Sequence, residues 1–386
     1  MDVEEGKILE NVDILIENRV ISRIGRDIGE TAGETRDMKG SFISPGLFNV
    51  HSHLSLPYSY KGRGESKKEP EASAAIRCFK RANDALLAGV TTVRTVGDPH
   101  RCDIHLRNAI REGHVRGPRI VAGGRAIGAT GGHGGGDHNE ADGADEFLRV
   151  ARRELSEGAE HLKIFLTGGM AGQQETPEEI QMTEDEITAV TSVAKSKGTY
   201  VTAHAGGSHA IIEATKLGVT CFEHGYALNR EAAQAIKGIG GFFVPTLAVT
   251  RCRDWYEKMG FDQWLIEKSL GFKTQHDESF KTAISEKVAV VCGTDVAPGD
   301  SESGVNITVR EIGWMNEAGL SPLDSLRSAT INAAKLCKLE RTTGVVKAGL
   351  AADLIATPSN PLASTKNLES IHFVMTDGVV VRNEME

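Results

Sequence analysis

The sequence has 386 residues, of which 40% are hydrophobic and 25% are charged, and its formal net charge at pH 7 is −9. A chain of this length buries about three quarters of its surface on folding, which predicts a large core and excludes a disordered chain. The acidic excess argues against a nucleic-acid partner. No apolar run approaches the roughly 20 residues of a membrane-spanning helix, so no membrane partner is expected. Residues 1–5 lack the features of a signal peptide, which predicts a cytoplasmic protein.

Short alternating strands are predicted at both ends of the chain. Residues 11–16 and 20–24 have the alternation of a β-hairpin with one face exposed to water. The end of the chain predicts strands at 352–356, 371–375 and 379–381, and its Asp377-Gly378 pair favours a hairpin turn. Both ends therefore predict β structure that differs in kind from the middle of the chain.

The middle of the chain, from residue 45 to residue 340, alternates short apolar runs with amphipathic helical patterns. Helices are clearest at 72–87 and 145–155, and a capping box is predicted at 183–186. Eight strand–helix units favour a (β/α)8 barrel over a doubly wound sheet, and neither GxGxxG nor GxxxxGK[ST] occurs to indicate a nucleotide. The predicted strands are 47–52, 90–96, 119–124, 161–166, 200–205, 221–225, 242–247 and 289–295.

A glycine-rich segment follows the third predicted strand, with eight glycines between Gly123 and Gly136. A flexible surface loop is one interpretation of this composition. The alternative is a catalytic loop, because the segment carries His133 and lies on the barrel face where active sites are built. Small residues also leave backbone N–H groups exposed, which predicts a cradle for an anionic group of a ligand.

Residues suited to metal binding stand at the carboxyl ends of several predicted strands. His51 and His53 lie two positions apart at the end of the first strand, so both imidazoles can point into the barrel mouth. An isolated HxH pair is weak evidence for a metal site. The other strand ends strengthen it, because barrel enzymes do their chemistry at this face. They carry Lys163 in strand four, His204 in strand five, His224 in strand six and Asp295 after strand eight.

This ordered set of HxH, Lys, His, His and Asp resembles the amidohydrolase superfamily over essentially the whole chain. The resemblance implies an α/β fold, with a (β/α)8 TIM-like barrel over residues 45–343. It also implies a small, discontinuous β-sandwich domain built from both chain ends, residues 1–44 and 344–386. Chains of this superfamily begin with an additional strand before the one predicted at 11–16, so either the sandwich lacks an edge strand or the start codon is misassigned.

The same resemblance implies two divalent metal ions, usually zinc, bridged by a lysine that CO2 has carboxylated. His51, His53 and Asp295 would bind one metal, the two later histidines would bind the other, and Lys163 would bridge both. As a carbamate this lysine becomes an anionic bidentate ligand, whereas a neutral lysine binds metals poorly. Asp295 can take a proton from the attacking water and pass it to the leaving amine. The implied metal ligands are His51, His53, Lys163, His204, His224 and Asp295.

Three local stretches resemble the imidazolonepropionase-related branch, closest to prolidase-like metallo-carboxypeptidases that cleave Xaa-Pro dipeptides, other dipeptides or N-acyl amino acids. In this branch His133 and Tyr226 contact the substrate, and His133 joins Asp295 and Lys163 in the catalytic set. The resemblance implies a homo-oligomeric hydrolase of an amide C–N bond whose small-molecule substrate carries a free carboxylate. The stretches are residues 131–134, Lys163 followed by the glycines at 168–169, and residues 224–226.

Other functions stay open at this point. A cyclic-amide hydrolase (imidazolonepropionase- or hydantoinase-like) or a phosphoester hydrolase would use the same metal centre, although imidazolonepropionases lack the bridging lysine. A scaffold barrel without metals would have lost ligands, and none is missing here. A serine hydrolase would use Ser208 in the GxSxG-like segment 206–210, with Asp295 and His372 in the chain order of a triad.

The segment after the seventh predicted strand is unusually long and aromatic. Residues 250–280 follow a helical pattern that includes Trp255, Tyr256, Phe261 and Trp264. This segment is expected to select the substrate side chain as a lid over the barrel mouth. Packing between subunits is the alternative interpretation.

Overall fold

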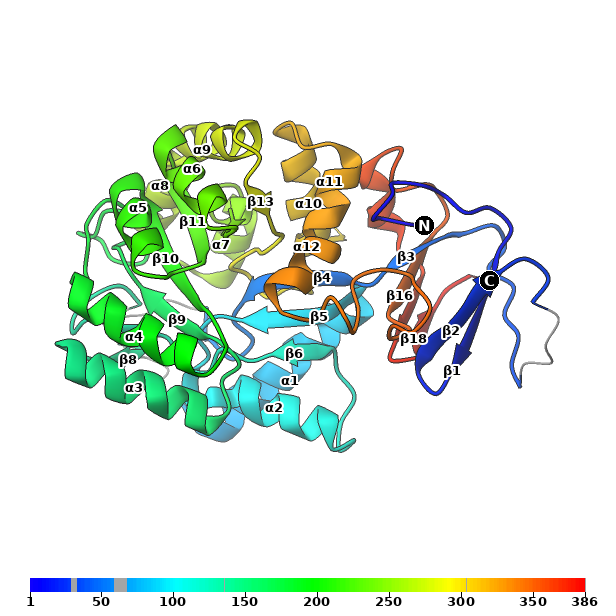
Figure 1. Ribbon diagram of the computed structural model, residues 1–386, viewed down its shortest axis with the longest axis horizontal. Coiled ribbons are helices and arrows are strands. Elements are labelled where there is room, and N and C mark those ends of the chain that lie inside the picture. Colours follow the sequence, from blue (N-terminus) through cyan, green and yellow to red (C-terminus); the bar gives the residue numbers. More distant parts are fainter. Residues whose placement is uncertain (29–32, 59–67, 135, 303, 386) are drawn as a thin grey trace.

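The computed structural model describes residues 1–28, 33–58, 68–134, 136–302 and 304–385. Its larger part is a ring of eight parallel strands surrounded by helices, which confirms the predicted TIM-like barrel (Figure 1). All eight predicted strands are present in the predicted order. They are β4 (Leu47–Ser52), β5 (Val90–Thr95), β6 (Arg119–Val121), β9 (Leu162–Phe165), β10 (Val201–Gly207), β11 (Cys221–Ala227), β12 (Phe242–Val244) and β13 (Ala289–Val290).

Helices follow the barrel strands and cover the outside of the ring. The predicted helices at 72–87 and 145–155 are α1 and α3, and α4 begins at a complete capping box in which Thr183 and Glu186 exchange hydrogen bonds. No helix in the described part of the chain is long and apolar enough to cross a membrane. The helices are α1 (Glu71–Leu87), α2 (Cys102–Arg111), α3 (Ala144–Glu157), α4 (Glu184–Ser196), α5 (Ser208–Lys216), α6 (Arg230–Gly238), α7 (Arg253–Met259), α8 (Gln263–Gly271), α9 (Lys273–Ser285), α10 (Ile307–Glu317), α11 (Pro322–Ser328) and α12 (Ile331–Leu336).

Backbone hydrogen bonds close the ring where the sheets meet. The Val50 N–H donates to the Cys292 carbonyl at 2.9 Å, and the Glu160 N–H donates to the Ala122 carbonyl at 2.7 Å. Strands β6, β12 and β13 end earlier than predicted, because the chain leaves the extended conformation beyond them. Thr246 and Asp295, for example, have φ values of 51° and 60°. The residues that follow these early strand ends form part of the rim of the barrel mouth.

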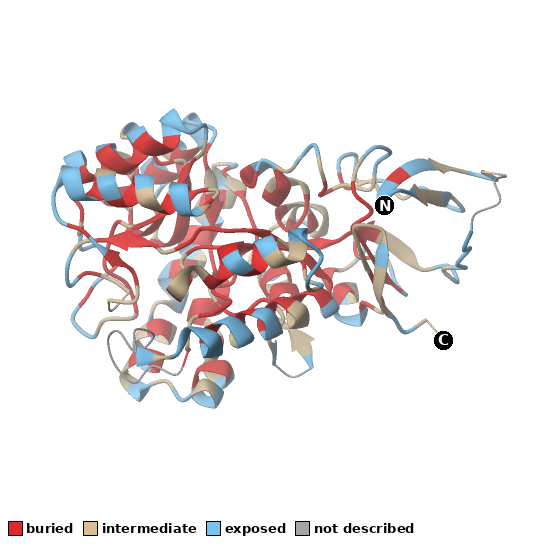
Figure 2. Cartoon of the chain, turned by 90° about the horizontal axis from the view of Figure 1, so that it is seen from below, coloured by how far each residue is buried: buried red, intermediate tan, exposed pale blue. Residues whose placement is uncertain are grey.

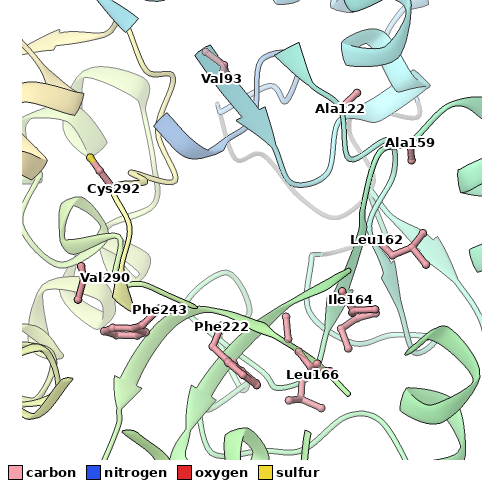
Figure 3. Close-up of a cluster of buried hydrophobic side chains, with 14 of the residues drawn as sticks. Val93, Ala122, Ala159, Leu162, Ile164, Leu166, Phe222, Phe243, Val290 and Cys292 are labelled. Carbon is pink, nitrogen blue, oxygen red and sulfur yellow. The ribbon is translucent and has the colours of Figure 1, made fainter. Parts of the chain in front are cut away.

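Apolar side chains of the barrel strands form the main core. Figure 3 shows a part of it, including Ile164, Phe222 and Phe243, each of which is fully buried. Figure 2 shows buried strands at the centre and helices whose outer faces are exposed. A core of this kind places the polar strand ends on a rigid frame.

The two chain ends pack together beside the barrel, as Figure 1 shows. Strands β1 (Asp13–Glu17) and β2 (Val20–Gly25) form an antiparallel hairpin. Strands β3 (Phe42–Pro45), β16 (Leu354–Thr357), β17 (Phe373–Thr376) and β18 (Val379–Asn383) form a second antiparallel sheet in the order β18-β17-β16-β3. Ile21, Ala352 and Leu354 are buried between the sheets, which together make the small β-sandwich. Asp377 and Gly378 make the predicted tight turn, with φ values of 44° and 72°.

Candidate metal centre

All eight predicted metal-binding and substrate-binding residues line one cavity at the carboxyl ends of the barrel strands. Potential ligand atoms of His51, His224 and Asp295 lie within 4.8 Å of one another. The ring centroids of His204 and His224 are 4.5 Å apart, and those of His51 and His53 are 5.5 Å apart. Residues that are distant in the sequence therefore form a single cluster of imidazoles around one carboxylate.

Asp295 sits at the centre of this cluster. Its Oδ1 lies 3.3 Å from Nε2 of His51 and 3.1 Å from Nε2 of His53. Burial alone would raise the pKa of Asp295, but the charges and hydrogen bonds of these two histidines lower it well below its usual value. The carboxylate is thus ionised, and it is available as a ligand or as a base. Its φ of 60° is unusual for a non-glycine residue, as is the φ of 71° at His224.

Each imidazole of the cluster is held through one ring nitrogen by a neighbouring oxygen. Such anchoring fixes the orientation of a metal-binding imidazole and leaves its second nitrogen for the ion. Burial lowers the pKa of His204 and His224 well below the usual value, so both rings are neutral, as ligands must be. The anchoring pairs are His51 Nδ1 with Glu223 at 2.7 Å, His53 Nδ1 with the Gly97 carbonyl at 2.7 Å, His224 Nδ1 with Thr246 at 2.7 Å and His204 Nε2 with the Gly168 carbonyl at 3.1 Å.

Glu223 and Arg94 form a buried ion pair beneath the cluster that the sequence interpretation missed. The Arg94 Nη2 lies 2.5 Å from Glu223 Oε1, and both side chains are completely buried. Burial would raise the pKa of Glu223, but Arg94 and then His51 lower it far below its usual value. Glu223 is therefore an anion that accepts a hydrogen bond from His51. The sequence does contain an indication of such a pair, because a charged residue inside a buried strand needs a partner of opposite charge.

Lys163 lies on β9 with only 2% of its surface exposed. Among the described residues its amine makes no hydrogen bond and no ion pair, and its Nζ lies 5.9 Å from the centre of the Phe165 ring. Burial lowers the pKa of Lys163 to about 8. Burying an amine without a hydrogen-bond or ion-pair partner costs free energy, unless a bound or covalently attached group provides that partner. The four imidazoles, the carboxylate and this amine together are a donor set that fits divalent metal ions and a carboxylated lysine.

His133 lies beside the cluster and is held by a carboxylate that the sequence did not indicate. Its Nδ1 is 2.7 Å from Glu175, and its ring stacks on His204 with a centroid distance of 3.9 Å. Lys268 on α8 fastens the same loop, because its Nζ donates to the carbonyl groups of Gly169, Gly172 and Glu175 at 2.6–2.8 Å. The helical segment 250–280 thus supports the loop that orients His133.

Residues 130–133 of the glycine-rich segment do not form the backbone cradle for an anion that the composition suggested. The N–H groups of residues 130–133 donate to acceptors within the protein at 2.8–3.3 Å. The side chains of Glu140, Asp142 and Gln181 occupy three of these groups, because the loop folds back onto polar residues that follow it.

Tyr226 and three of the aromatic residues of 250–280 face the same cavity. The Tyr226 ring stacks on His224 at 5.3 Å, and its hydroxyl has no hydrogen-bond partner among the described residues. Burial raises the pKa of Tyr226 well above its usual value, so the hydroxyl keeps its proton. Trp255, Tyr256 and Phe261 line the cavity, whereas Trp264 packs beside it. This placement agrees with the interpretation of the segment as a cover over the site.

The alternative catalytic triad is not assembled. The Ser208 hydroxyl donates to the Ala227 carbonyl at 2.6 Å and accepts the Asn229 N–H at 2.7 Å. His372 bonds Ser41 in the region of the terminal sheets, and Asp295 contacts the two histidines of the first strand. The serine-hydrolase alternative is therefore wrong, because Ser208 stabilises the start of a helix.

Comparisons with known proteins agree with this geometry. A prolidase crystallised with n-methylphosphonate-L-proline is 27% identical with a TM-score of 0.89, covering 99% of this chain and 97% of that chain. A Xaa-Pro dipeptidase crystallised with methionine in its active site is 29% identical with a TM-score of 0.88, covering 99% and 98%. Ochratoxinase from Aspergillus niger is 25% identical over 394 residues, which cover 94% of this chain and 80% of that protein.

The chain also matches a protein family over most of its length. Residues 42–381, which include the barrel and much of the terminal sheets, match the amidohydrolase family. The structural likeness to prolidases confirms the prolidase-like branch that the sequence resembles. The chain therefore belongs to the amidohydrolase family and is an amide-hydrolysing enzyme.

Proposed function

We propose that this enzyme is a binuclear metal-dependent hydrolase that releases an amino acid from a dipeptide or an N-acyl amino acid, as prolidase-like carboxypeptidases do. The observation that carries the proposal is the cavity itself. It brings six potential metal ligands together with His133 and Tyr226, two polar side chains suited to a substrate. The similarity to a prolidase and a Xaa-Pro dipeptidase supports this substrate class.

Lys163 is proposed to act as a carbamate. Its amine nitrogen would attack CO2 and lose one proton, which gives an anion with two oxygen atoms. A pKa of about 8 leaves roughly a tenth of the amine unprotonated at pH 7, so the nucleophilic form is accessible. The carbamate would supply the negative charge that the four neutral imidazoles do not.

The side chains around the carbamate are proposed to have different roles in hydrolysis. Two divalent ions, proposed to be zinc, would polarise the scissile carbonyl and acidify the attacking water. The residues that would hold them are His51, His53, Lys163, His204, His224 and Asp295. Asp295 accepts the proton that water loses as its oxygen bonds to the carbonyl carbon. The same carboxyl group then gives that proton to the leaving nitrogen as the C–N bond breaks. Its ionised state and central position support this role.

His133 and Tyr226 are proposed to bind the carboxylate next to the scissile amide. Glu175 accepts a hydrogen bond from Nδ1 of His133, so Nε2 donates to an oxygen of the substrate in the protonated form of the ring, whose positive charge also attracts a carboxylate. The Tyr226 hydroxyl keeps its proton and has no partner among the described side chains. Both side chains line the cavity, and a carboxylate has two oxygens that accept such hydrogen bonds.

The test compares a dipeptide with its C-terminal amide, using the metal-loaded enzyme. Loss of the charge is expected to lower kcat/KM by about one to two orders of magnitude, because a charge-assisted hydrogen bond is lost. His133→Ala and Tyr226→Phe are expected to shrink this difference. Equal hydrolysis of acid and amide would contradict the proposal and favour a cyclic-amide substrate.

A further inference from the structure

One wall of the cavity is aromatic, and among the described residues it carries no charged side chain. Tyr58, Trp255, Tyr256 and Phe261 line it, with ring centroids 5.0–5.5 Å apart. The charged residues that line the cavity, among those described, are Asp137, Lys163 and Asp295, and all three lie outside this aromatic cluster.

The polar atoms of this wall are already occupied by the protein. The Trp255 Nε1 donates to Asp300 at 3.0 Å, and the Tyr256 hydroxyl donates to the Val249 carbonyl at 2.8 Å. The Tyr58 hydroxyl donates to the His53 carbonyl at 3.3 Å. The wall therefore offers a substrate mainly ring faces and edges, which bind apolar groups well and polar groups poorly.

His133 and most of the aromatic wall follow strands on opposite sides of the barrel. Most of the aromatic wall follows β12, the seventh strand of the ring, whereas the segment with His133 follows β6, the third strand. Third and seventh strands of an eight-stranded ring face each other across its axis. A substrate whose carboxylate is near His133 thus directs its acyl group to the aromatic wall.

We propose that Tyr58, Trp255, Tyr256 and Phe261 form a subsite for a bulky apolar acyl group, and that the substrates are dipeptides or N-acyl amino acids with an aromatic or large aliphatic acyl side. This inference rests on the proposed function. It excludes small and charged acyl groups as good substrates, because a small group leaves the wall uncovered and a charged group loses its hydration there.

The first test compares Phe-Ala, Gly-Ala, Lys-Ala and the reversed dipeptide Ala-Phe. Phe-Ala is expected to exceed Gly-Ala about 100-fold in kcat/KM, from the apolar area that its side chain buries, and to exceed Lys-Ala and Ala-Phe as well. Trp255→Ala is expected to reduce the ratio of Phe-Ala to Gly-Ala about tenfold. Trp264→Ala is the matched control and leaves the ratio unchanged, because Trp264 does not line the cavity. Equal rates, or a preference for Ala-Phe, would overturn the subsite.

A binding measurement separates the subsite from the reaction. 3-Phenylpropanoate, which corresponds to the apolar acyl half, is expected to quench the fluorescence of the protein, and Trp255→Phe should remove most of this quenching. Quenching at Trp255 in an enzyme that cleaves no dipeptide would support the subsite and contradict the proposed reaction. Turnover of dipeptides without any quenching by this probe would defeat the subsite alone.

A second, independent observation concerns His138 on the opposite wall. It lines the cavity with 3% of its surface exposed, and neither of its ring nitrogens has a hydrogen-bond partner among the described residues. Every imidazole of the metal cluster has such a partner, which makes His138 an exception. Its ring stands perpendicular to Phe165 at a centroid distance of 5.1 Å.

Two glycines pack closely against the nitrogens of His138, and neither position has room for a side chain. A Cβ at Gly128 would lie 3.0 Å from Nε2, and a Cβ at Gly134 would lie 3.0 Å from Nδ1. Burial lowers the pKa of His138 to about 4, so the ring is neutral near pH 7 and has one N–H to donate. A buried donor without a partner costs free energy that a bound group can return.

We infer that His138 is a further substrate-binding residue, whose N–H donates to the carboxylate proposed to lie near His133. This inference also rests on the proposed function. The backbone donors of residues 130–133 are already occupied and offer a carboxylate no hydrogen bond, whereas the His138 N–H has no partner among the described residues.

The test uses His138→Leu, His138→Asn, and the pair Phe-Ala and its C-terminal amide. Leucine is expected to raise KM for the acid about tenfold or more and to leave KM for the amide nearly unchanged, whereas asparagine, which keeps an N–H donor, changes both little. The melting temperature of His138→Leu should not fall, because an unsatisfied buried polar group is removed. Equal changes for acid and amide, or a large loss of stability with unchanged KM, would show a packing role only. If the leucine variant does not fold, the asparagine variant together with His138→Gln decides by the same acid-to-amide ratio.

Discussion

The cluster of histidines around Asp295 and the cavity walls around it are built differently. In the cluster, imidazoles stand at or just beyond strand ends and each is anchored by an oxygen from another part of the barrel, as His51 is by Glu223 and His224 is by Thr246. The walls come from the segments after the strands, and His138 in one wall has no partner among the described residues. The frame thus holds the reacting groups rigidly, whereas the walls leave polar and apolar surface for a substrate. Changes in the cluster should remove the chemistry, and changes in the walls should alter selectivity.

The largest effect is expected for Lys163→Ala. Without a carbamate no anion links the two metal positions, so metal content should fall to one equivalent or less and kcat by about four orders of magnitude. Metal analysis and steady-state kinetics measure both. Partial rescue by propionate would support the carbamate, and two bound metals with near-normal turnover would refute the bridge.

The next effect is expected for Asp295→Asn. An amide cannot accept the proton of the attacking water, so kcat should fall by about two orders of magnitude or more. The fold and most of the metal are expected to remain, as circular dichroism and metal analysis can establish. An unchanged kcat would remove Asp295 from the chemistry and leave it as a ligand alone.

A smaller effect is expected for Glu223→Gln, which tests whether anchoring matters. His51 loses a charged partner, and metal affinity should fall about 10- to 100-fold. Arg94 would keep a buried charge without a counter-charge, so the free energy of unfolding should fall by about 3–5 kcal/mol.

The matched control for this variant is Glu154→Gln. Glu154 is also buried and lies 2.5 Å from Arg101, but it is outside the cavity. It should lower stability and leave metal affinity unchanged. A similar loss of metal affinity in both variants would mean that Glu223 acts through general stability and not through His51.

The smallest effect is expected for Lys268→Met, a change in the support of one wall. Three carbonyl groups of the loop that carries Glu175 lose their shared donor, so His133 should be held less firmly. KM for a dipeptide is expected to rise about three- to tenfold while kcat changes little. Lys273→Met, whose amine pairs with Asp277 at the surface, is the control and should change neither constant. A fall in kcat with constant KM would place Lys268 closer to the chemistry than the walls.

Much of the frame could be predicted, because the signals are local. Alternating apolar residues predict each strand wherever it packs, and His51 and His53 share a strand end whatever their neighbours do. The order of metal-binding residue types along the chain then pointed to the right family before any contact was known.

What only the tertiary structure decided are contacts between distant segments. Arg94 contacts Glu223, 129 positions away in the chain, and Lys268 contacts Gly169, 99 positions away. No local sequence pattern predicts either pair. The composition of the glycine-rich segment suggested free backbone donors, but Gln181 and the acidic residues after the loop take several of them.

The sequence by itself therefore determined the barrel, the terminal sheets and the residue types at the strand ends, since each depends on periodicity within a few residues. The folded chain decided which polar groups are satisfied, as at His51, and which are left for a substrate, as at His138. The physical reason is that hydrogen bonding and burial are properties of the surroundings in space. Those surroundings come from segments that the sequence keeps far apart.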